Sequence, residues 1–219
     1  MQETFLFQLN TQNSLANHFL TELRKSGFQE DRLRFRRNLE RIGELLAYEL
    51  SKTLHYKEQI IQTPLAPAEV NLLIEQPVLI TILRAGLPLH QGVLNYFDQA
   101  DSGFVGAFRD HHDDHTFDIA LSYFTMPDVH QKDVVLIDPM LASGRTIAEV
   151  CKNFGDTIQP NHLHIVSAIA SPEGIDYLRQ NLSFPFSIWT GAIDQKLNSM
   201  AYIIPGLGDA GDLSFGSKI

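Results

Sequence analysis

The chain has 219 residues, of which 44% are hydrophobic, 20% charged and 10% aromatic, and its net charge is −9. This composition is that of a globular protein with a sizeable core, so it excludes a disordered or fibrous chain. The acidic balance argues against non-specific nucleic-acid binding, which requires a broad positive surface.

Membrane insertion and disulfide formation are not expected either. No apolar run approaches the roughly twenty residues that a membrane span requires. Glu3 and the short apolar runs near the N-terminus argue against a secretory signal. Cys151 is the single cysteine, which excludes an internal disulfide and a cysteine zinc cluster. We therefore expect a cytoplasmic protein with no membrane partner.

The first part of the chain is expected to be helical. Two helices are predicted, over 14–25 and 31–54, and the second has leucine and isoleucine at helical spacing. The segment DRLRFRRNLER, residues 31–41, holds five arginines. Acidic residues are interleaved with them, which favours a solvated helix face over a contact with an anion or another subunit.

After Pro77 the pattern changes to short β-rich runs that alternate with helices. Ser171, Pro172 and Glu173 form a helix start, with a capping hydroxyl, a proline and an acid at the positive end of the helix dipole. The predicted strands are 78–83, 104–108, 134–137, 163–169 and 186–189, and the predicted helices are 88–97, 146–154 and 171–180. This alternation predicts an α/β fold with a mostly parallel sheet flanked by helices.

Functional residues are expected in the turns after the strands, because ligands of open parallel sheets bind beyond the carboxyl ends of their strands. Three turns are rich in glycine, proline and polar residues: 84–88, 138–146 and 205–212. The second turn carries the strongest signal. It lies in VVLIDPMLASGRTIAEV, residues 134–150, where a buried strand ends in Asp138 and a short loop leads into a helix.

The loop 138–146 is predicted to bind an anion. Gly144 lets backbone N–H groups turn inward, Ser143 and Thr146 add hydroxyl donors, and the helix N-terminus adds partial positive charge. Asp138 is placed to accept hydrogen bonds from sugar hydroxyls. The spacing and lysine of a Walker P-loop are absent, and so is a dinucleotide fingerprint. The alternative is a plain strand–turn–helix with a capping threonine.

The loop resembles the phosphoribosyl-diphosphate loop of the type I phosphoribosyltransferases, in which a hydrophobic run and an aspartate precede A-[ST]-G-x-[ST]. Its Asp-Pro-Met-Leu-Ala form is similar to that of the uracil phosphoribosyltransferases, since most of the superfamily has two adjacent acids there. Further stretches resemble that family in the same order along the chain: residues 34–49, 82–88 (ILRAGLP), 171–178, 192–198 and 202–216 (YIIPGLGDAGDLSFG). The resemblance therefore covers nearly the whole chain.

The resemblance implies an activity, a cofactor and a domain plan. The activity is transfer of the 5-phosphoribosyl group from 5-phospho-α-D-ribose 1-diphosphate to uracil, giving UMP and diphosphate in pyrimidine salvage. Mg²⁺ would be bound mainly through substrate phosphates, and GTP is an effector of some members. The plan is one domain over 1–219, with an N-terminal helical part (1–57), a core sheet (58–190) and a uracil-binding tail (191–219). Because the family forms dimers or larger assemblies, we expect a homo-oligomer.

The resemblance also implies roles for individual residues. Asp138 and Arg84 would be catalytic, with Arg84 on the donor's diphosphate and Arg109 as a second donor-binding arginine. The donor loop would comprise Asp138, Pro139, Met140, Leu141, Ala142, Ser143, Gly144, Arg145 and Thr146. The uracil site would comprise Ile203, Gly208, Asp209 and Ala210, and Asp209 would also reach the donor.

Three features depart from the family pattern. Ser143 replaces the usual threonine and keeps its hydroxyl, whereas Arg145 replaces the usual glycine and changes both size and charge. The flap stretch 110–127 is longer and matches poorly, with Thr125 where a lysine is common. These departures leave the flap contacts and GTP activation open. We expect Arg145, as a loop residue just before the helix, to point outward or toward the diphosphate.

Weaker candidates lie elsewhere in the chain. The sequence HHDDH, residues 111–115, is suggestive of a metal site, but a solvated polar loop is favoured. His162 and His164 alternate on a predicted strand edge and are expected at the surface. Cys151 lies inside a predicted helix with no base to activate it, so an inert packing role is expected.

Three other functions stay open. A phosphoribosyltransferase for another base, such as orotate, would need a cationic partner, and 202–212 contains no lysine or arginine. A regulator that senses nucleotides and binds RNA is suggested by the SGRT form of the loop, although the net charge and the tail sequence argue against it. The third is an inactive paralogue of the same fold.

Overall fold

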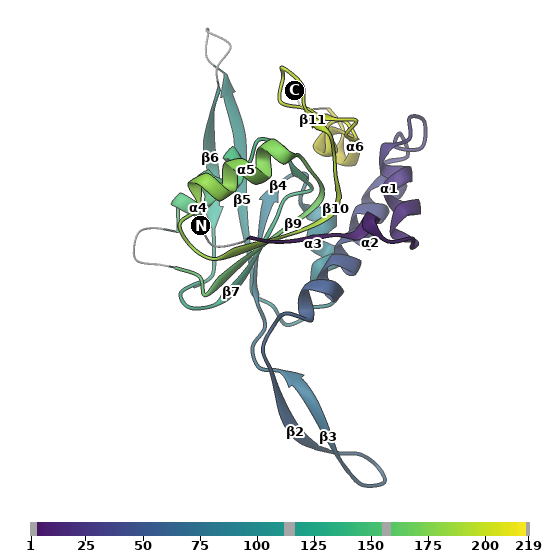
Figure 1. The fold of residues 1–219 in the computed structure, drawn as a ribbon, viewed down its shortest axis with the longest axis vertical. Coiled ribbons are helices and arrows are strands. Elements are labelled where there is room, and N and C mark those ends of the chain that lie inside the picture. The colour runs from purple at the N-terminus through teal and green to yellow at the C-terminus, as the bar shows by residue number, and fades with distance from the viewer. Residues whose placement is uncertain (1–3, 112–116, 155–158, 218–219) are drawn as a thin grey trace.

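The structure is a computed structural model that describes residues 4–111, 117–154 and 159–217, with the side chains of 108–121 excepted. Its main strands are β1 (Phe5–Gln8), β4 (Val78–Leu83), β5 (Ser102–His111), β6 (Phe117–Thr125), β7 (Asp133–Ile137), β9 (His162–Ala170) and β10 (Phe186–Ile193). They form a sheet in the order β1-β10-β9-β7-β4-β5-β6 (Figure 1). Neighbours run parallel except β5 and β6, which are antiparallel. The expected mostly parallel sheet is therefore confirmed.

Helices cover both faces of this sheet. The helices of one face are α1 (Ala16–Arg24), α2 (Arg32–Ser51) and α3 (Leu87–Leu94), and those of the other are α4 (Arg145–Lys152) and α5 (Pro172–Asn181). Leu79 and Val135 enter the core beneath the first group, whereas the next residues, Ile80 and Leu136, enter the core beneath the second. Consecutive strand residues point to opposite faces, so both faces need cover and the strands read as continuous apolar runs.

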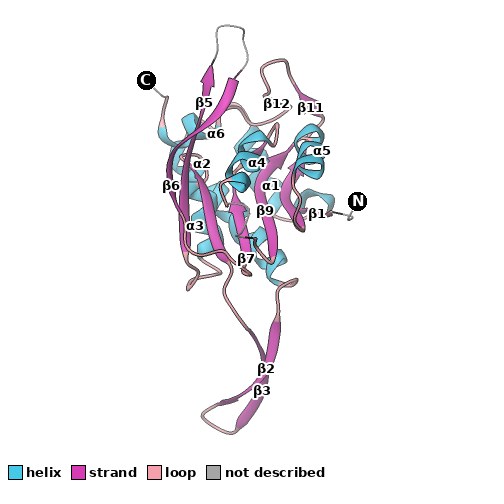
Figure 2. Cartoon of the chain, turned by 90° about the vertical axis from the view of Figure 1, so that its left-hand side faces the viewer, coloured by secondary structure: helices cyan, strands magenta, loops and turns pink. Residues whose placement is uncertain are grey.

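Several elements were not predicted from the sequence, among them a hairpin and the first strand. β2 (Tyr56–Gln62) and β3 (Pro67–Leu73) form an antiparallel hairpin that projects away from the body as an arm (Figures 1 and 2). It lies in the part expected to build the core sheet, yet it pairs only with itself in the described structure. Conversely, β1 lies in the part expected to be helical and completes one edge of the sheet.

The local predictions are confirmed to within a few residues. The predicted strand 78–83 coincides with β4, and the predicted helix 31–54 becomes α2, which ends at Ser51. The predicted cap of α5 is present, since Ser171 Oγ accepts a hydrogen bond from the Gly174 N–H at 2.9 Å. Within the described residues, no helix is both long and apolar enough to span a membrane.

The expectation that His162 and His164 lie on a surface edge is wrong, because β9 is an interior strand between β10 and β7. His164 is 4% exposed, and its Nδ1 lies 2.9 Å from the Ser187 hydroxyl on the neighbouring strand. Burial lowers the pKa of His164 to about 3 and also lowers the pKa of the partly buried His162. The inert role of Cys151 is supported, because burial in α4 raises the pKa of its thiol.

Candidate active site

Two of the predicted turns meet at the carboxyl ends of neighbouring parallel strands. β4 and β7 are parallel neighbours in which Thr81 pairs with Ile137, so the turn after β4 and the loop after β7 leave the sheet at the same end. A Cβ at Gly86 would lie 2.5 Å from the carbonyl O of Ile82 and 3.2 Å from that of Ile137. Only glycine lets the turn 84–88 pack this closely against both strand ends.

Asp138 follows β7 directly and is half-buried. Its backbone N–H donates to the Val166 carbonyl at 3.1 Å, and its Oδ1 accepts from the Met140 N–H at 3.3 Å. The chain then forms the short strand β8 (Met140–Leu141), which pairs with the end of β9. These bonds hold the start of the loop 138–146 on the sheet and set the direction of the Asp138 carboxylate.

The loop ends in a glycine turn. Gly144 has φ of 74°, a left-handed conformation that favours glycine, and it caps the N-terminus of α4. Arg145 is therefore the first residue of α4, not the last residue of the loop as expected, and it is exposed. Thr146 follows in the first turn of the helix, so the first N–H groups of α4 are directed toward the loop, as an anion site requires.

α5 packs against the backbone of the same loop. The Ser171 hydroxyl, which caps α5, donates to the Ala142 carbonyl at 2.6 Å. A Cβ at Gly174 would lie 2.2 Å from that carbonyl oxygen, so α5 packs directly on the loop backbone. A second glycine contact is reciprocal, because a Cβ at Gly144 would lie 2.8 Å from the Gly174 carbonyl.

The C-terminal tail comes to the turn after β4. The tail contains β11 (Lys196–Leu197), β12 (Ile203–Ile204) and α6 (Ala210–Phe215). Asp209 caps α6, where its Oδ1 accepts from the N–H groups of Gly211 and Asp212 at 2.8 and 3.0 Å. Arg84 donates to Asp212 Oδ1 at 3.1 Å and to the Gly216 carbonyl at 3.0 Å. One arginine thus joins the first predicted turn to the third.

The predicted uracil residues offer mainly backbone. Ile203 and Ala210 are 3% and 2% exposed, and both side chains belong to the core on the α1–α3 side. Gly208 has φ of 90°, in the left-handed region, and no side chain. What this segment can present to a small planar ligand is therefore its N–H and C=O groups.

Comparison with known proteins agrees with this geometry. The profile of the family described as "Uracil phosphoribosyltransferase" matches residues 10–217. The chain belongs to the uracil phosphoribosyltransferase family. It is 44% identical to a uracil phosphoribosyltransferase from Porphyromonas gingivalis over 98% of this chain and 99% of the relative. A uracil phosphoribosyltransferase from Thermococcus gammatolerans is 37% identical over 91% and 88% of the two chains. The solved structure of the AQ2163 protein from Aquifex aeolicus is similar to this chain, with a TM-score of 0.84 and 31% sequence identity. The similarity covers 98% of this chain and 100% of that chain.

Arg109, the second donor-binding arginine that the sequence resemblance implies, is described only in part. The backbone of Arg109 lies in β5, paired with Ile119 of β6, and its side chain lies outside the described residues. Most of the candidate HHDDH segment also lies outside the described residues, apart from the backbone of His111 in β5.

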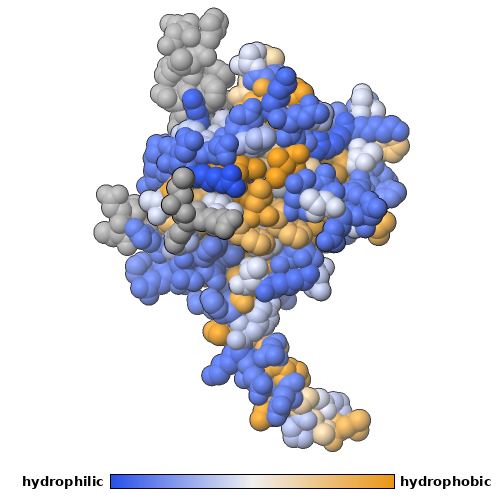
Figure 3. All heavy atoms as spheres, viewed as in Figure 1, coloured by the Kyte–Doolittle hydropathy of each residue, from blue (hydrophilic) through white to orange (hydrophobic). Residues whose placement is uncertain are grey.

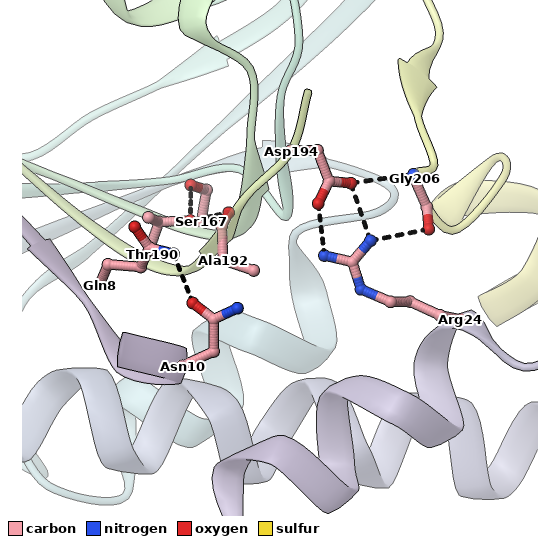
Figure 4. Close-up of polar contacts among 8 residues, drawn as sticks. All are labelled: Gln8, Asn10, Arg24, Ser167, Thr190, Ala192, Asp194 and Gly206. Carbon is pink, nitrogen blue, oxygen red and sulfur yellow. Dashed lines mark hydrogen bonds and ion pairs between the residues drawn. The ribbon is translucent and has the colours of Figure 1, made fainter. Parts of the chain in front are cut away.

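Arg24 and Asp194 contact the C-terminal tail and were not singled out from the sequence. Arg24 of α1 forms a bidentate ion pair with Asp194, at 2.7 and 2.8 Å, and both contact Gly206 of the tail (Figure 4). Asp194 directly follows β10, and this position after a strand was an available signal. Arg24 lies on a helix surface, where nothing in the local sequence distinguishes it.

The carboxylates of the site can be compared with what Mg²⁺, the ion that the family implies, requires of its ligands. Among the described residues, no three His, Cys, Asp or Glu side chains group together as a metal-binding cluster. The carboxylates at the site are Asp138, held by the loop, Asp209, held at the α6 cap, and Asp212, paired with Arg84. Such a set suits an ion that is carried by diphosphate oxygens and water.

An open cavity of about 620 Å³ lies beside the tail, lined by Gln29, Glu30, Asp31, Arg32, Asp212 and Leu213. None of the loop residues 138–146 lines it, although Asp212, which pairs with Arg84, does. We place the candidate active site at the sheet edge because the strand ends, the helix N-terminus and the tail converge there.

Proposed function

We propose that the chain transfers the 5-phosphoribosyl group of 5-phospho-α-D-ribose 1-diphosphate to N1 of uracil and so makes UMP for pyrimidine salvage. The bond from ribose C1′ to the diphosphate oxygen breaks, the bond from N1 to C1′ forms, and the N1 proton leaves to solvent. The observation that carries this proposal is that the turn after β4, which packs through Gly86 against the end of β7, is joined to the C-terminal tail by Arg84.

The donor's 5′-phosphate is assigned to the loop 138–146. The N–H groups around Gly144 and the hydroxyls of Ser143 and Thr146 would bind phosphate oxygens, helped by the positive end of α4. Asp138 would accept hydrogen bonds from the ribose hydroxyls and stabilise the positive charge that develops on the ring. The half-buried setting of its carboxylate supports this role, since less water competes for it.

The donor's diphosphate is assigned to Arg84 and Arg109. Mg²⁺, when bound, neutralises negative charge on the departing diphosphate. In the structure Arg84 is held by Asp212 and the Gly216 carbonyl. Donor binding would therefore exchange these contacts for diphosphate oxygens, which form stronger charge-assisted bonds.

Uracil is assigned to the tail, where the backbone around Ile203, Gly208 and Ala210 would read its donors and acceptors. A base with a carboxylate, such as orotate, lacks a partner, because 202–212 contains no lysine or arginine. This argues for uracil among the pyrimidines.

An assay of nucleotide formation tests the proposal. The protein is mixed with donor, Mg²⁺ and either uracil, orotate or hypoxanthine, and UMP or the matching nucleotide is followed by chromatography, with and without GTP. UMP from uracil is expected. No nucleotide from any base would indicate an inactive paralogue, and salt-sensitive RNA binding by such a protein would favour the regulator.

We also propose that the chain forms a homo-oligomer through its arm. β2 is exposed along its whole length, and Leu65, Ile60 and Ile74 are 96%, 72% and 59% exposed. Figure 3 shows apolar residues at the tip of this arm. A lone two-stranded hairpin is only marginally stable in water, so a second copy that covers it would stabilise it.

A further inference from the structure

The base-binding tail is fixed to the N-terminal helix by a small set of charged bonds. Arg24 Nη1 and Nη2 donate to Asp194 Oδ2 and Oδ1 at 2.8 and 2.7 Å. Arg24 Nη1 also donates to the Gly206 carbonyl at 3.1 Å, and the Gly206 N–H donates to Asp194 Oδ2 at 2.9 Å. Both backbone polar groups of Gly206 are thus bonded to one ion pair (Figure 4).

The ion pair is shielded from water. The Asp194 side chain is 6% exposed and the Arg24 side chain 23% exposed. A carboxylate in such a setting is costly unless its oxygens are bonded, and here Arg24 and Gly206 supply three hydrogen bonds. Loss of either charge leaves the other buried without its partner, so the turn at Gly206 depends on both residues.

The conformation of this turn requires glycine at position 206. Gly206 has φ of 65°, and a Cβ there would lie 2.1 Å from the Ile203 carbonyl. The next residue is held from the same side, because Gln29 Nε2 donates to the Leu207 carbonyl at 2.9 Å and to the Leu23 carbonyl at 3.0 Å. Arg24, at the end of α1, and Gln29, in the segment that follows it, therefore hold two consecutive residues of the tail.

We propose that Arg24 and Asp194 are positioning residues for the base, which set the turn 205–208 so that the backbone from Ile203 to Ala210 faces uracil. Neither residue is assigned a contact with substrate. Asp194 fixes the turn to the end of β10, and Arg24 fixes it to α1. The inference rests on the proposed function for its substrate, but the restraint on the turn can be measured without any substrate.

Steady-state kinetics of Arg24→Gln and Asp194→Asn give the first test. We expect KM for uracil to rise about tenfold or more, while KM for the donor changes less than about twofold, because only the base-binding turn loosens. Arg24→Lys keeps the charge but not the bidentate fork, and it should recover part of the loss. The double variant should be no worse than the poorer single variant if the pair acts as one unit.

Arg34→Gln is the matched control. It breaks another bidentate pair to α1, with Glu22, that does not contact the tail. It should leave KM for uracil unchanged. If Arg34→Gln raises KM for uracil as much as Arg24→Gln does, or if both substrates lose affinity equally in the Arg24 and Asp194 variants, the positioning role is overturned.

Hydrogen exchange of the substrate-free protein gives the second test. The Gly206 amide should exchange about tenfold faster or more in Asp194→Asn and Arg24→Gln, whereas Arg34→Gln should not change it. Unchanged exchange at Gly206 would overturn the inference even in an active enzyme. If the wild type makes no UMP, the proposed function fails, and the exchange data alone decide whether this pair holds the turn.

Discussion

Arg84 and Asp138 show how single side chains carry the candidate chemistry. Arg84 directly follows β4 and holds the tail through Asp212. Asp138 is oriented by its own backbone bonds and by Met140. Both residues therefore have defined partners in the structure, and Arg84 would have to give up its partners to bind the diphosphate.

Asp138→Asn should reduce turnover about a hundredfold or more with folding intact, because the amide cannot stabilise positive charge on the ribose ring. The measurement is the kcat of UMP formation, with thermal unfolding as the check on folding. Asp133→Asn, at the opposite end of β7, is the control and should keep wild-type turnover. Unchanged turnover in a folded Asp138→Asn would remove this carboxylate from the mechanism.

His164 should make the protein less stable in acid. Its pKa is about 3 in the folded protein, held there by burial, against an ordinary value of 6.5. Because the unfolded chain binds the proton at higher pH, the stabilisation by neutral His164 is complete above about pH 6.5 and is lost as pH falls toward 3. The free energy of unfolding in urea should fall by up to about 1.4 kcal/mol per pH unit for this one proton.

His164→Gln removes that titration, so its stability should depend less steeply on pH between about 6.5 and 3. His18→Gln, which removes an exposed imidazole from α1, is the control. Equal slopes for His164→Gln and the wild type would contradict the prediction.

At the scale of elements, the N-terminus of α4 borders the candidate site, and α2, which carries the arginines of 31–41, contacts the tail. The arginines of 31–41 form more than a solvated face. Arg34 pairs with Glu22 of α1, and Arg36 donates to the Ser214 carbonyl of α6 at 2.7 Å. The Arg36 contact, like those of Arg24, joins the N-terminal helices to the C-terminal tail, whereas Arg34 joins α2 to α1.

Gly174→Ala should disturb the donor loop through α5. The new Cβ would lie 2.2 Å from the Ala142 carbonyl oxygen, so helix or loop must shift. We expect a loss of about 1–3 kcal/mol of stability, the usual range for overpacking, and a higher KM for the donor. Gln180→Ala, on the exposed side of α5, is the control and should change neither. A wild-type KM for the donor in Gly174→Ala would show that the loop does not depend on this packing.

At the scale of the whole molecule, the arm of β2 and β3 stands apart from the central sheet. Tyr56 pairs with Leu73, so the two ends of the arm are already adjacent. The arm carries exposed apolar side chains, and among its residues only Leu73, at its base, packs against a core.

Replacing residues 57–72 by a two-residue Gly-Asn turn should leave a folded protein that no longer self-associates. Light scattering coupled to size-exclusion chromatography would give the masses, and circular dichroism would check the fold. Leu65→Ser is a milder variant that should weaken association without shortening the chain. An unchanged mass after removal of the arm would place the interface elsewhere.

Sequence reasoning predicted most of the strands and helices after Pro77, the turn between β7 and α4, and the cap of α5, because these depend on residues within a few positions of one another. The tertiary structure alone decided which turns meet, that His164 is interior, and that β1 completes the sheet. Arg24 and Asp194 are separated by 170 positions, and their contact depends on the spatial order of strands and helices. Local pattern does not encode that order, since it is set by which apolar faces pack together.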